Sequence, residues 1–344
     1  MYLIRRPSPV KGNVGDSALV LTIESLFDFY DIEYFSPTVK KAEAIEDYTK
    51  YDALIYFGND TIAYYGISKS LIKSFIDLGK PIHIINTSYG KDRKNNFLRS
   101  IGKYKSLTLW ARDTYSQSLI EDDIKPLNPV QLCADLAHLC PDNCNLSNLS
   151  QSQSELVQWI NSSTVPVVAL NLHEDFGENN IYVQSQFEAF VKEHSNQFRF
   201  LFLPHDSRTT RGEVKINQQF YEAFRSNSYL SDVLDPAFEI YVLRKLHSVI
   251  TCRMHLGILA LRSGIPPIII GYNGVKAKGL LDHWGLENDL YFNPAGKESL
   301  TDKFQYVNAH YSKMLTHISF QSLIVSNLAM KPISTVIEQF QKKK

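Results

Sequence analysis

Short apolar runs alternate with amphipathic stretches along nearly the whole chain of 344 residues, and this alternation limits the folds that it can adopt. Runs such as DALIYF (52–57) and PIHIIN (81–86) have the length of buried strands. Stretches such as ISKSLIKSFIDLG (67–79) have the apolar spacing of surface helices. Short strands that alternate with longer helices predict βαβ units, so we expect an α/β protein with mostly parallel sheets.

A change in composition divides this pattern into two parts. Residues 140–159, CPDNCNLSNLSQSQSELVQW, are rich in Ser, Asn and Gln and lack strand character. We therefore predict a Rossmann-like amino-terminal domain over residues 1–145 and a Rossmann-like carboxy-terminal domain over residues 160–300. Residues 301–344 are expected to form carboxy-terminal helices. Two such domains predict a two-lobed enzyme whose parallel sheets face each other across a ligand-binding cleft.

The charge balance and the cysteine content exclude several classes of protein. The 36 basic and 36 acidic residues give a net charge of zero, which argues against a nucleic-acid partner. Cys140 and Cys144 have no second Cys or His pair at ligand spacing, so we expect no metal. No apolar run is long enough to span a membrane and the amino terminus lacks a signal-peptide pattern, which favours a cytoplasmic protein.

Polar side chains follow nearly every predicted strand in both halves. Strand ends become loops, so each residue alone fits a structural role as well as a functional one. The recurrence of Asp, Arg and His favours a site, because ligands of such folds bind beyond the carboxyl ends of the strands. The residues are Asn59-Asp60, Asn86-Thr87-Ser88, Arg112-Asp113, Asp135, Asn171, His173, His205-Asp206, Arg253, His255 and Asn273.

The segment CRMHLGILALRSGIPPIIIGYNGVKAKG (252–279) holds Arg253 and His255 at a strand end and Lys276 beyond the next strand. Two permanent cations and an imidazole in one such unit predict a ligand with two or three negative charges. Structural alternatives stay open for each residue. Arg253 could pair with an acid of the other lobe, His255 could be a satisfied histidine at a helix start, and Lys276 could be solvated.

The segment GNVGDSAL (12–19) is a glycine-containing entry into a predicted helix. Its two glycines allow the backbone to pass close to a ligand, and the helix start offers free N–H groups. It matches neither a P-loop nor a dinucleotide-binding fingerprint. Asp16 could therefore be a ligand-facing residue or the N-cap of the helix.

Together, GNVGD (12–16), ARDTYS (111–116), CADLAHL (133–139) and the block over residues 253–286 resemble the polysaccharide pyruvyl transferases in content and order. The resemblance covers most of the chain, and its carboxy-terminal block is the most specific part. It implies a GT-B-like fold, in agreement with the two-lobed prediction. Many members have three glycines where this chain has FGNDT (57–61), so Asn59 and Asp60 are a departure whose extra carboxylate could alter the acceptor pocket.

The resemblance implies transfer of a carboxyethylidene group from phosphoenolpyruvate to a sugar of a cell-surface or extracellular polysaccharide, with no cofactor or metal. Arg253, Lys276 and Arg112 would hold the donor anions in the carboxy-terminal domain, with Arg112 reaching them from the other lobe. His255 would be the acid that protonates the donor, and Asp16 would serve the acceptor as base or orienter. The remaining acceptor-binding residues, expected in the amino-terminal domain or facing its cleft, would be Asn13, Asp60, Asp135 and His205.

The acceptor would be a sugar or a lipid-linked oligosaccharide, and the latter would allow peripheral membrane contact. Two other functions stay open. A GT-B glycosyltransferase that uses a nucleotide-sugar could hold a diphosphate with the same cations, although an acidic residue for the ribose is not evident beyond Asp282. A sugar-binding homologue without catalysis is the third alternative, and the presence of Asp16, Arg253 and His255 argues against it.

Overall fold

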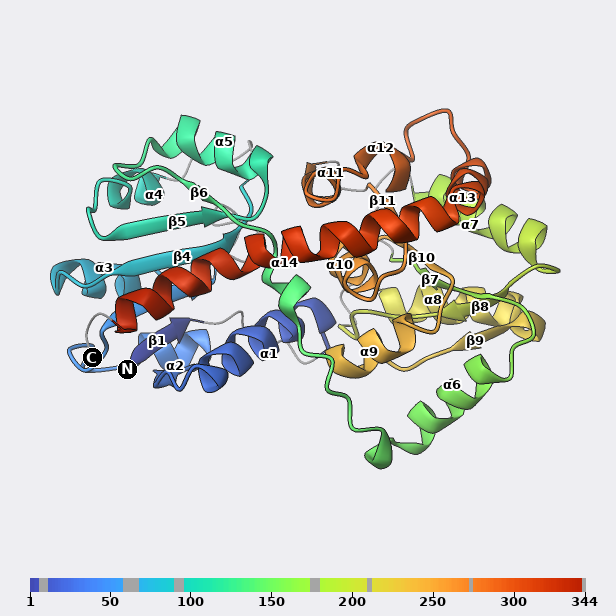
Figure 1. Cartoon of the computed structure of the whole chain (residues 1–344), viewed down its shortest axis with the longest axis horizontal. Helices are drawn as coiled ribbons and strands as arrows, with labels where there is room; N and C mark the ends of the chain where they lie inside the picture. The colour runs from blue at the N-terminus through green and yellow to red at the C-terminus, as the bar shows by residue number, and fades with distance from the viewer. Residues whose placement is uncertain are drawn as a thin grey trace. The chain divides into compact units, whose positions relative to one another are not determined.

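The computed structural model describes residues 1–5, 12–57, 68–89, 96–173, 180–208, 212–271 and 275–341. The chain divides into two compact units (Figure 1). The first consists of Met1–Pro9, Leu19–Leu139 and Val325–Lys344, and the second of Val10–Ala18 and Cys140–Ile324. The change of unit after Leu139 falls at the start of the polar segment that marked the domain boundary in the sequence. Two short segments differ from the sequence-based division, because residues 10–18 belong to the second unit and the end of the chain belongs to the first.

The first unit is built on a six-stranded parallel sheet. Its strands are β1 (Tyr2–Arg5), β2 (Tyr34–Phe35), β3 (Ala53–Phe57), β4 (Ile82–Thr87), β5 (Leu107–Ala111) and β6 (Gln131–Leu132). They are arranged in the order β2-β1-β3-β4-β5-β6. The central strands β3 and β4 are buried along their whole length, which explains why their sequences are almost continuously apolar.

The helices of this unit follow the strands in alternation. They are α1 (Val14–Phe29), whose first turn belongs to the second unit, α2 (Val39–Glu43), α3 (Lys69–Asp77), α4 (Asn96–Ile101) and α5 (Thr114–Ile124). Helix α3 buries Leu71, Ile72 and Phe75, one stripe of an otherwise polar helix. The apolar periodicity of the sequence therefore marked the surface that covers the sheet.

The second unit also has a six-stranded parallel sheet. Its strands are β7 (Val167–Asn171), β8 (Arg199–Phe202), β9 (Ser228–Leu230), β10 (Ser248–Thr251), β11 (Pro267–Ile270) and β12 (Tyr291–Phe292). Their order is β12-β11-β10-β7-β8-β9, the Rossmann order with the switch point between β7 and β10. The helices are α6 (Gln151–Asn161), α7 (Asn180–His194), α8 (Glu213–Ala223), α9 (Pro236–Leu243), α10 (Met254–Arg262), α11 (Val275–Asp282), α12 (Glu287–Leu290) and α13 (Leu300–Ala309). The predicted fold class, two Rossmann-like parallel sheets, is confirmed.

The chain ends in the long helix α14 (Tyr311–Gln341), which confirms the predicted helical carboxy terminus. The division between the units falls within this helix, before Val325. Its second half packs on the first unit, where Gln339 accepts a hydrogen bond from His83 Nε2 at 3.0 Å. Across the described part of the chain, every helix is too short or too polar to cross a membrane.

Candidate active site

The carboxyl ends of three neighbouring strands of the second unit carry a connected polar network. Thr251, the last residue of β10, is in register with Asn171, the last residue of β7. The Thr251 hydroxyl donates to Asn171 Oδ1 at 3.1 Å, and Asn171 Nδ2 donates to Leu203 O at 2.9 Å and to Glu213 Oε1 at 2.7 Å. The strand register thus sets the geometry at the switch point, where ligands of this fold bind.

Arg253 is the N-cap residue of α10 and is held from several sides. Its backbone N–H donates to Thr251 Oγ1 at 2.8 Å, and its Nε donates to Glu213 Oε2 at 2.5 Å. A terminal nitrogen lies 3.5 Å from Asp206 Oδ2, and 19% of the side chain remains exposed. The structural alternative of an acid partner therefore holds for Arg253, but the acids come from the same unit rather than from the other lobe.

Glu213, the first residue of α8, is the centre of this network and is fully buried. In addition to Asn171 and Arg253, it accepts a hydrogen bond from the backbone N–H of His205 at 2.5 Å. A buried carboxylate needs several such donors because its charge has lost its hydration. Asn171 at the end of β7, His205 after β8 and Arg253 after β10 are consequently joined through one side chain that the sequence analysis did not single out.

Asp206 adds a second buried carboxylate beside Arg253. Burial acts to raise the pKa of Asp206, but hydrogen bonds from the side chain and backbone of Arg208, with the positive charges of Arg253 and Arg208, outweigh it and lower the pKa. The two guanidinium groups are thus matched by two carboxylates. The local charge is more balanced than the cations of the sequence alone suggested.

The GNVGD segment lies against this network. Asn13 forms an antiparallel bridge with Asp206, and Ser207 N donates to Gly12 O at 2.8 Å. Gly12 has a φ of +103°, and a β-carbon there would lie 1.7 Å from Ser207 Oγ. A β-carbon on Gly15 would lie 2.3 Å from Nδ1 of His255. Both glycines are therefore required by the close approach of protein to protein.

Asn13 and Asp16 differ from the sequence-based prediction both in their positions at the helix start and in the unit to which they belong. Asn13 Oδ1 accepts a hydrogen bond from Asp16 N at 3.1 Å, immediately before α1 begins at Val14. Asn13 therefore caps the helix, and Asp16 lies in its first turn rather than at the N-cap. Both residues belong to the second unit because the turn at Gly12 is hydrogen-bonded to the loop after β8, whereas the sequence analysis placed them in the amino-terminal domain.

The structure brings His255 to the same end of the second sheet as Arg253, in the first turn of α10. Lys276 lies in the first turn of α11, which packs against α10, and its side chain is partly buried. Asn273 and Asp60 lie outside the described residues. The predicted donor-binding residues of the second unit therefore lie at the starts of two helices, α10 and α11, that pack against each other.

Two predicted residues of the first unit pair with each other. Arg112 follows β5, Asp135 follows β6, and Arg112 donates to Asp135 Oδ2 at 2.9 Å with both side chains buried. Asn86, in a left-handed conformation with φ 56°, donates to the same oxygen at 3.4 Å. The sequence analysis had assigned Arg112 to the donor and Asp135 to the acceptor, and it had no means of detecting their ion pair. Asp113, next in the ARDTYS motif, caps α5 through Ser116 N.

His205 is buried and is paired with Glu239 of α9. Its Nδ1 lies 3.1 Å from Oε1 and 3.3 Å from Oε2 of that carboxylate. The sequence analysis missed Glu239. The signal that could have found it is a single acid in the otherwise apolar helix PAFEIYVL, because charged residues are seldom buried without a partner.

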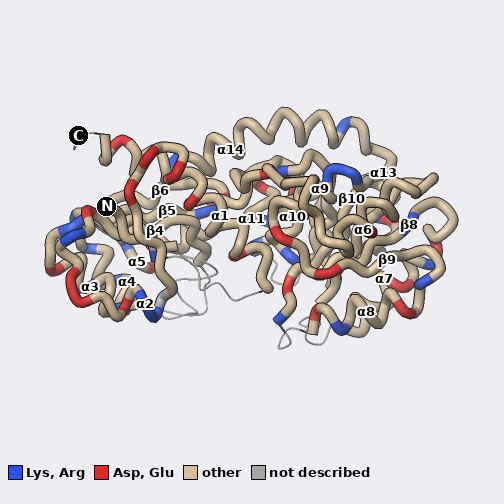
Figure 2. Tube along the Cα trace, turned by 90° about the horizontal axis from the view of Figure 1, so that it is seen from below, with Lys and Arg blue, Asp and Glu red and all other residues tan. Residues whose placement is uncertain are grey.

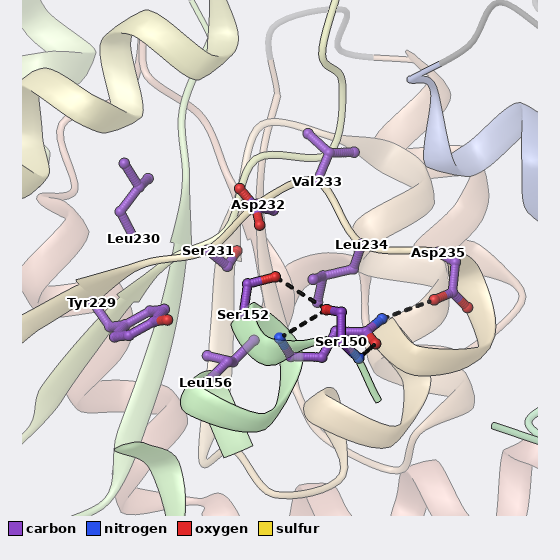
Figure 3. Close-up of a pocket in the computed structure, with 11 residues that line it drawn as sticks. Ser150, Ser152, Leu156, Tyr229, Leu230, Ser231, Asp232, Val233, Leu234 and Asp235 are labelled. Carbon is purple, nitrogen blue, oxygen red and sulfur yellow. Dashed lines mark hydrogen bonds between the residues drawn. The ribbon is translucent and has the colours of Figure 1, made fainter. Parts of the chain in front are cut away.

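A cavity of about 380 Å³ lies elsewhere in the second unit, between the start of α6 and the loop from β9 to α9 (Figure 3). Ser150 and Asp235 in its wall are the N-caps of α6 and α9. Gln153 Nε2 donates to Asp235 Oδ2 at 3.4 Å. Two of the polar side chains of this wall are therefore engaged in capping helix starts, and none of the predicted site residues lines the cavity.

Charges of both signs are interspersed in each unit (Figure 2). Among the described residues, no three His, Cys, Asp or Glu side chains are grouped so that they could hold a metal ion. The independence of the site from metals stays a prediction.

The model of the polysaccharide pyruvyl transferase family matches residues 13–274, more than half of the chain. No curated protein matches the chain. Among solved structures, the chain is similar to UDP-GlcNAc 2-epimerase from Neisseria meningitidis, with a TM-score of 0.59, 11% identity and coverage of 98% of this chain and 99% of that one. A glycosyltransferase from Rickettsia africae gives a TM-score of 0.60, 11% identity and coverage of 100% and 99%. At such low identity these likenesses show the GT-B-like fold.

Proposed function

Because the chain belongs to the polysaccharide pyruvyl transferase family, we propose that it transfers a carboxyethylidene group from phosphoenolpyruvate to two hydroxyls of a sugar. The supporting observation is the contact between the two family motifs that lie farthest apart in the sequence. Gly15 of GNVGD packs on the ring of His255 of the RMH segment, and Asn13 pairs with Asp206 beside Arg253. This arrangement gathers the His255 imidazole, the Asp206 carboxylate and the Arg253 guanidinium at the strand ends of one unit.

The donor carries a phosphate and a carboxylate, and we assign their binding to Arg253, Lys276 and Arg112. Arg253 is held by Glu213 and Asp206, so its guanidinium is oriented before the donor arrives and its exposed part can contact an anion. Because those two carboxylates compensate its charge, Lys276 is expected to supply much of the attraction. Arg112 has its own buried partner, Asp135, and a role in donor binding would have to coexist with that pair.

The chemistry begins with a proton that His255 delivers to C3 of phosphoenolpyruvate, which leaves C2 electron-deficient. One acceptor hydroxyl then attacks C2 and loses its proton. The second hydroxyl attacks C2 as the C2–O bond to phosphate breaks, and the electron pair of that bond leaves with the phosphate. Asp16, in the turn that contacts His255, is the proposed base or orienter for one hydroxyl. Asn13, Asp60, Asp135 and His205 remain the proposed acceptor-binding residues.

Incubation of the full chain with phosphoenolpyruvate and a panel of sugar and lipid-linked acceptors tests the proposal. We expect an acceptor with the added ketal mass and one released phosphate for each ketal. The reaction is expected to survive EDTA, because the anions are met by side-chain cations. Thermal shift with phosphoenolpyruvate against a panel of nucleotide diphosphates is the second measurement. Stabilisation by a nucleotide diphosphate alone, without ketal formation, would favour a nucleotide-sugar glycosyltransferase.

We further propose that the reaction takes place in the cytoplasm and serves extracellular polysaccharide biosynthesis. The family of the chain supports the second statement. Cell fractionation followed by detection of the protein tests the first. Loss of pyruvylated polysaccharide from a strain lacking the gene tests the second.

A further inference from the structure

The proposed donor chemistry does not use the buried hydrogen bond between His205 and Glu239. His205 is only 2% exposed and Glu239 is 0% exposed. A carboxylate can only accept hydrogen bonds, so the contact of 3.1 Å from Nδ1 to Oε1 requires the hydrogen to be on Nδ1. In the neutral ring, Nε2 then carries the free lone pair.

The second observation concerns Nε2 itself. This atom is buried and has no hydrogen-bond partner among the residues that the structure describes. Leaving a buried polar atom without a partner is unfavourable, because the atom has lost its hydrogen bonds to water. Because Glu239 already holds the other ring nitrogen, Nε2 is the part of the ring that a ligand is expected to complete.

The backbone of His205 is attached to both parts of the proposed site. Its carbonyl accepts a hydrogen bond from Val14 N at 3.2 Å, in the turn that precedes Asp16. Its N–H donates to Glu213, the carboxylate that also holds Arg253. Glu239 therefore sets the orientation of the ring, and these two backbone contacts set its position.

The proton balance of ketal formation provides a task for this ring. Two acceptor hydroxyls lose a proton, while C3 of the donor gains one and the departing phosphate takes one. Asp16 accounts for one hydroxyl at most. Building on the proposed function, we infer that His205 Nε2 is the base that deprotonates the other acceptor hydroxyl, with Glu239 as the residue that positions it.

In this step the hydroxyl O–H bond breaks and its proton moves to Nε2, while the oxygen forms a bond to C2. The C2–O bond to phosphate breaks, and phosphate leaves with the electron pair. The proton on Nε2 is passed to the phosphate, which departs as hydrogen phosphate, so the ring returns to its neutral state. Glu239 stabilises the imidazolium that exists between these events.

The decisive variant is His205→Asn. The amide nitrogen of Asn can replace Nδ1 as the donor to Glu239, but the variant has no counterpart of Nε2. We expect kcat to fall by about 10²–10⁴-fold, the range for general base catalysis, with KM for phosphoenolpyruvate within about three-fold of the wild-type value. Glu239→Gln is expected to lower kcat similarly, and Glu239→Asp to restore part of it. Glu222→Gln, an exposed position on α8, is the control.

A second measurement is independent of activity. Nitrogen-15 NMR of His205 in the full chain should show a protonated Nδ1 in the wild type and a shift toward protonated Nε2 in Glu239→Gln. A protonated Nε2 in the wild type at neutral pH, or undiminished kcat in folded His205→Asn protein, overturns the inference. If the wild-type protein forms no ketal with any acceptor, the proposed function fails and the base role fails with it. Ketal formation that is insensitive to both variants removes only the base role.

Discussion

Gly15 and His255, 240 positions apart in the chain, lie so close that a β-carbon on Gly15 would be 2.3 Å from the imidazole Nδ1. No such contact is tolerated between real atoms, so Gly15→Ala must displace either the ring or the first turn of α1. We expect the variant to lose at least about ten-fold in kcat, since small misplacements of catalytic groups are costly.

Gly79→Ala is the control for this first prediction. Gly79 has a φ of +67° with no atom near its potential β-carbon, so the substitution costs roughly 1–2 kcal/mol of backbone strain without touching the site. Pyruvyl transfer and melting curves of both variants separate the effects. Wild-type turnover in Gly15→Ala would show that His255 tolerates displacement.

His255→Ala should abolish turnover while donor binding remains. The proton is needed in the transition state, whereas the ground state is held chiefly by permanent cations, so we expect a loss of about 10²–10⁴-fold in kcat. Affinity for phosphoenolpyruvate, measured by calorimetry, should change by less than about three-fold. His310→Ala, an exposed histidine at the end of α13, is the control. Wild-type kcat in a folded His255→Ala protein would assign the acid to another group.

Lys276→Met should weaken the donor far more than the acceptor. Loss of a charge-assisted contact to a bound anion costs about 1.5–3 kcal/mol, which corresponds to about a ten- to 150-fold loss of affinity. Lys278→Met on the same helix is the matched control, because Lys278 is half-exposed and lies 3.8 Å from Glu287. Calorimetric titration with phosphoenolpyruvate distinguishes the two. Equal donor affinity in both variants would mean that Lys276 is a solvated surface charge.

Glu213→Gln should destabilise the protein markedly at neutral pH. The substitution leaves Arg253 and Asn171 without the buried carboxylate that joins them, and removal of one partner of a buried ion pair typically costs about 3–5 kcal/mol. Glu222→Gln, at the exposed end of the same helix, should change the free energy of unfolding by less than about 0.5 kcal/mol. Denaturant unfolding measures both. Equal stability of the two variants would contradict the central role of Glu213.

His83 should make the protein less stable in mild acid. Burial lowers the pKa of His83 from 6.5 to about 4, although its hydrogen bond with Gln339 acts to raise it. Between pH 6.5 and pH 4 the unfolded chain binds a proton at His83 more readily than the folded chain does. The free energy of unfolding is therefore unaffected by the titration of His83 above about pH 6.5 and decreases as the pH falls to about 4. The loss should approach about 3 kcal/mol.

His83→Gln is the matched variant for the pH prediction. It can keep a hydrogen bond to Gln339 but does not titrate, so its free energy of unfolding should depend less on pH over the same interval. Denaturant unfolding between pH 4 and pH 7 measures the difference. Identical pH dependence in both proteins would mean that His83 is not buried as a neutral ring.

Much of the architecture was determined by the sequence alone. The apolar runs 52–57 and 81–86 correspond, within one residue at each end, to the buried strands β3 and β4, and the polar segment that begins at Cys140 marked the change of unit. The family motifs also identified Arg253 and His255 at a strand end. These features could be predicted because strand and helix periodicities, and the turn after a strand, depend on residues close together in the chain.

The pairing of the polar residues was decided only by the tertiary structure. Arg253 with Glu213, Arg112 with Asp135 and His205 with Glu239 each join side chains that are more than twenty positions apart. The turn at Gly12 joined the second unit for the same reason, through hydrogen bonds to the loop after β8. Such contacts depend on strand order and register, which bring distant residues together. A local pattern marks a strand end as polar, but it carries no information on which distant side chain will lie beside it.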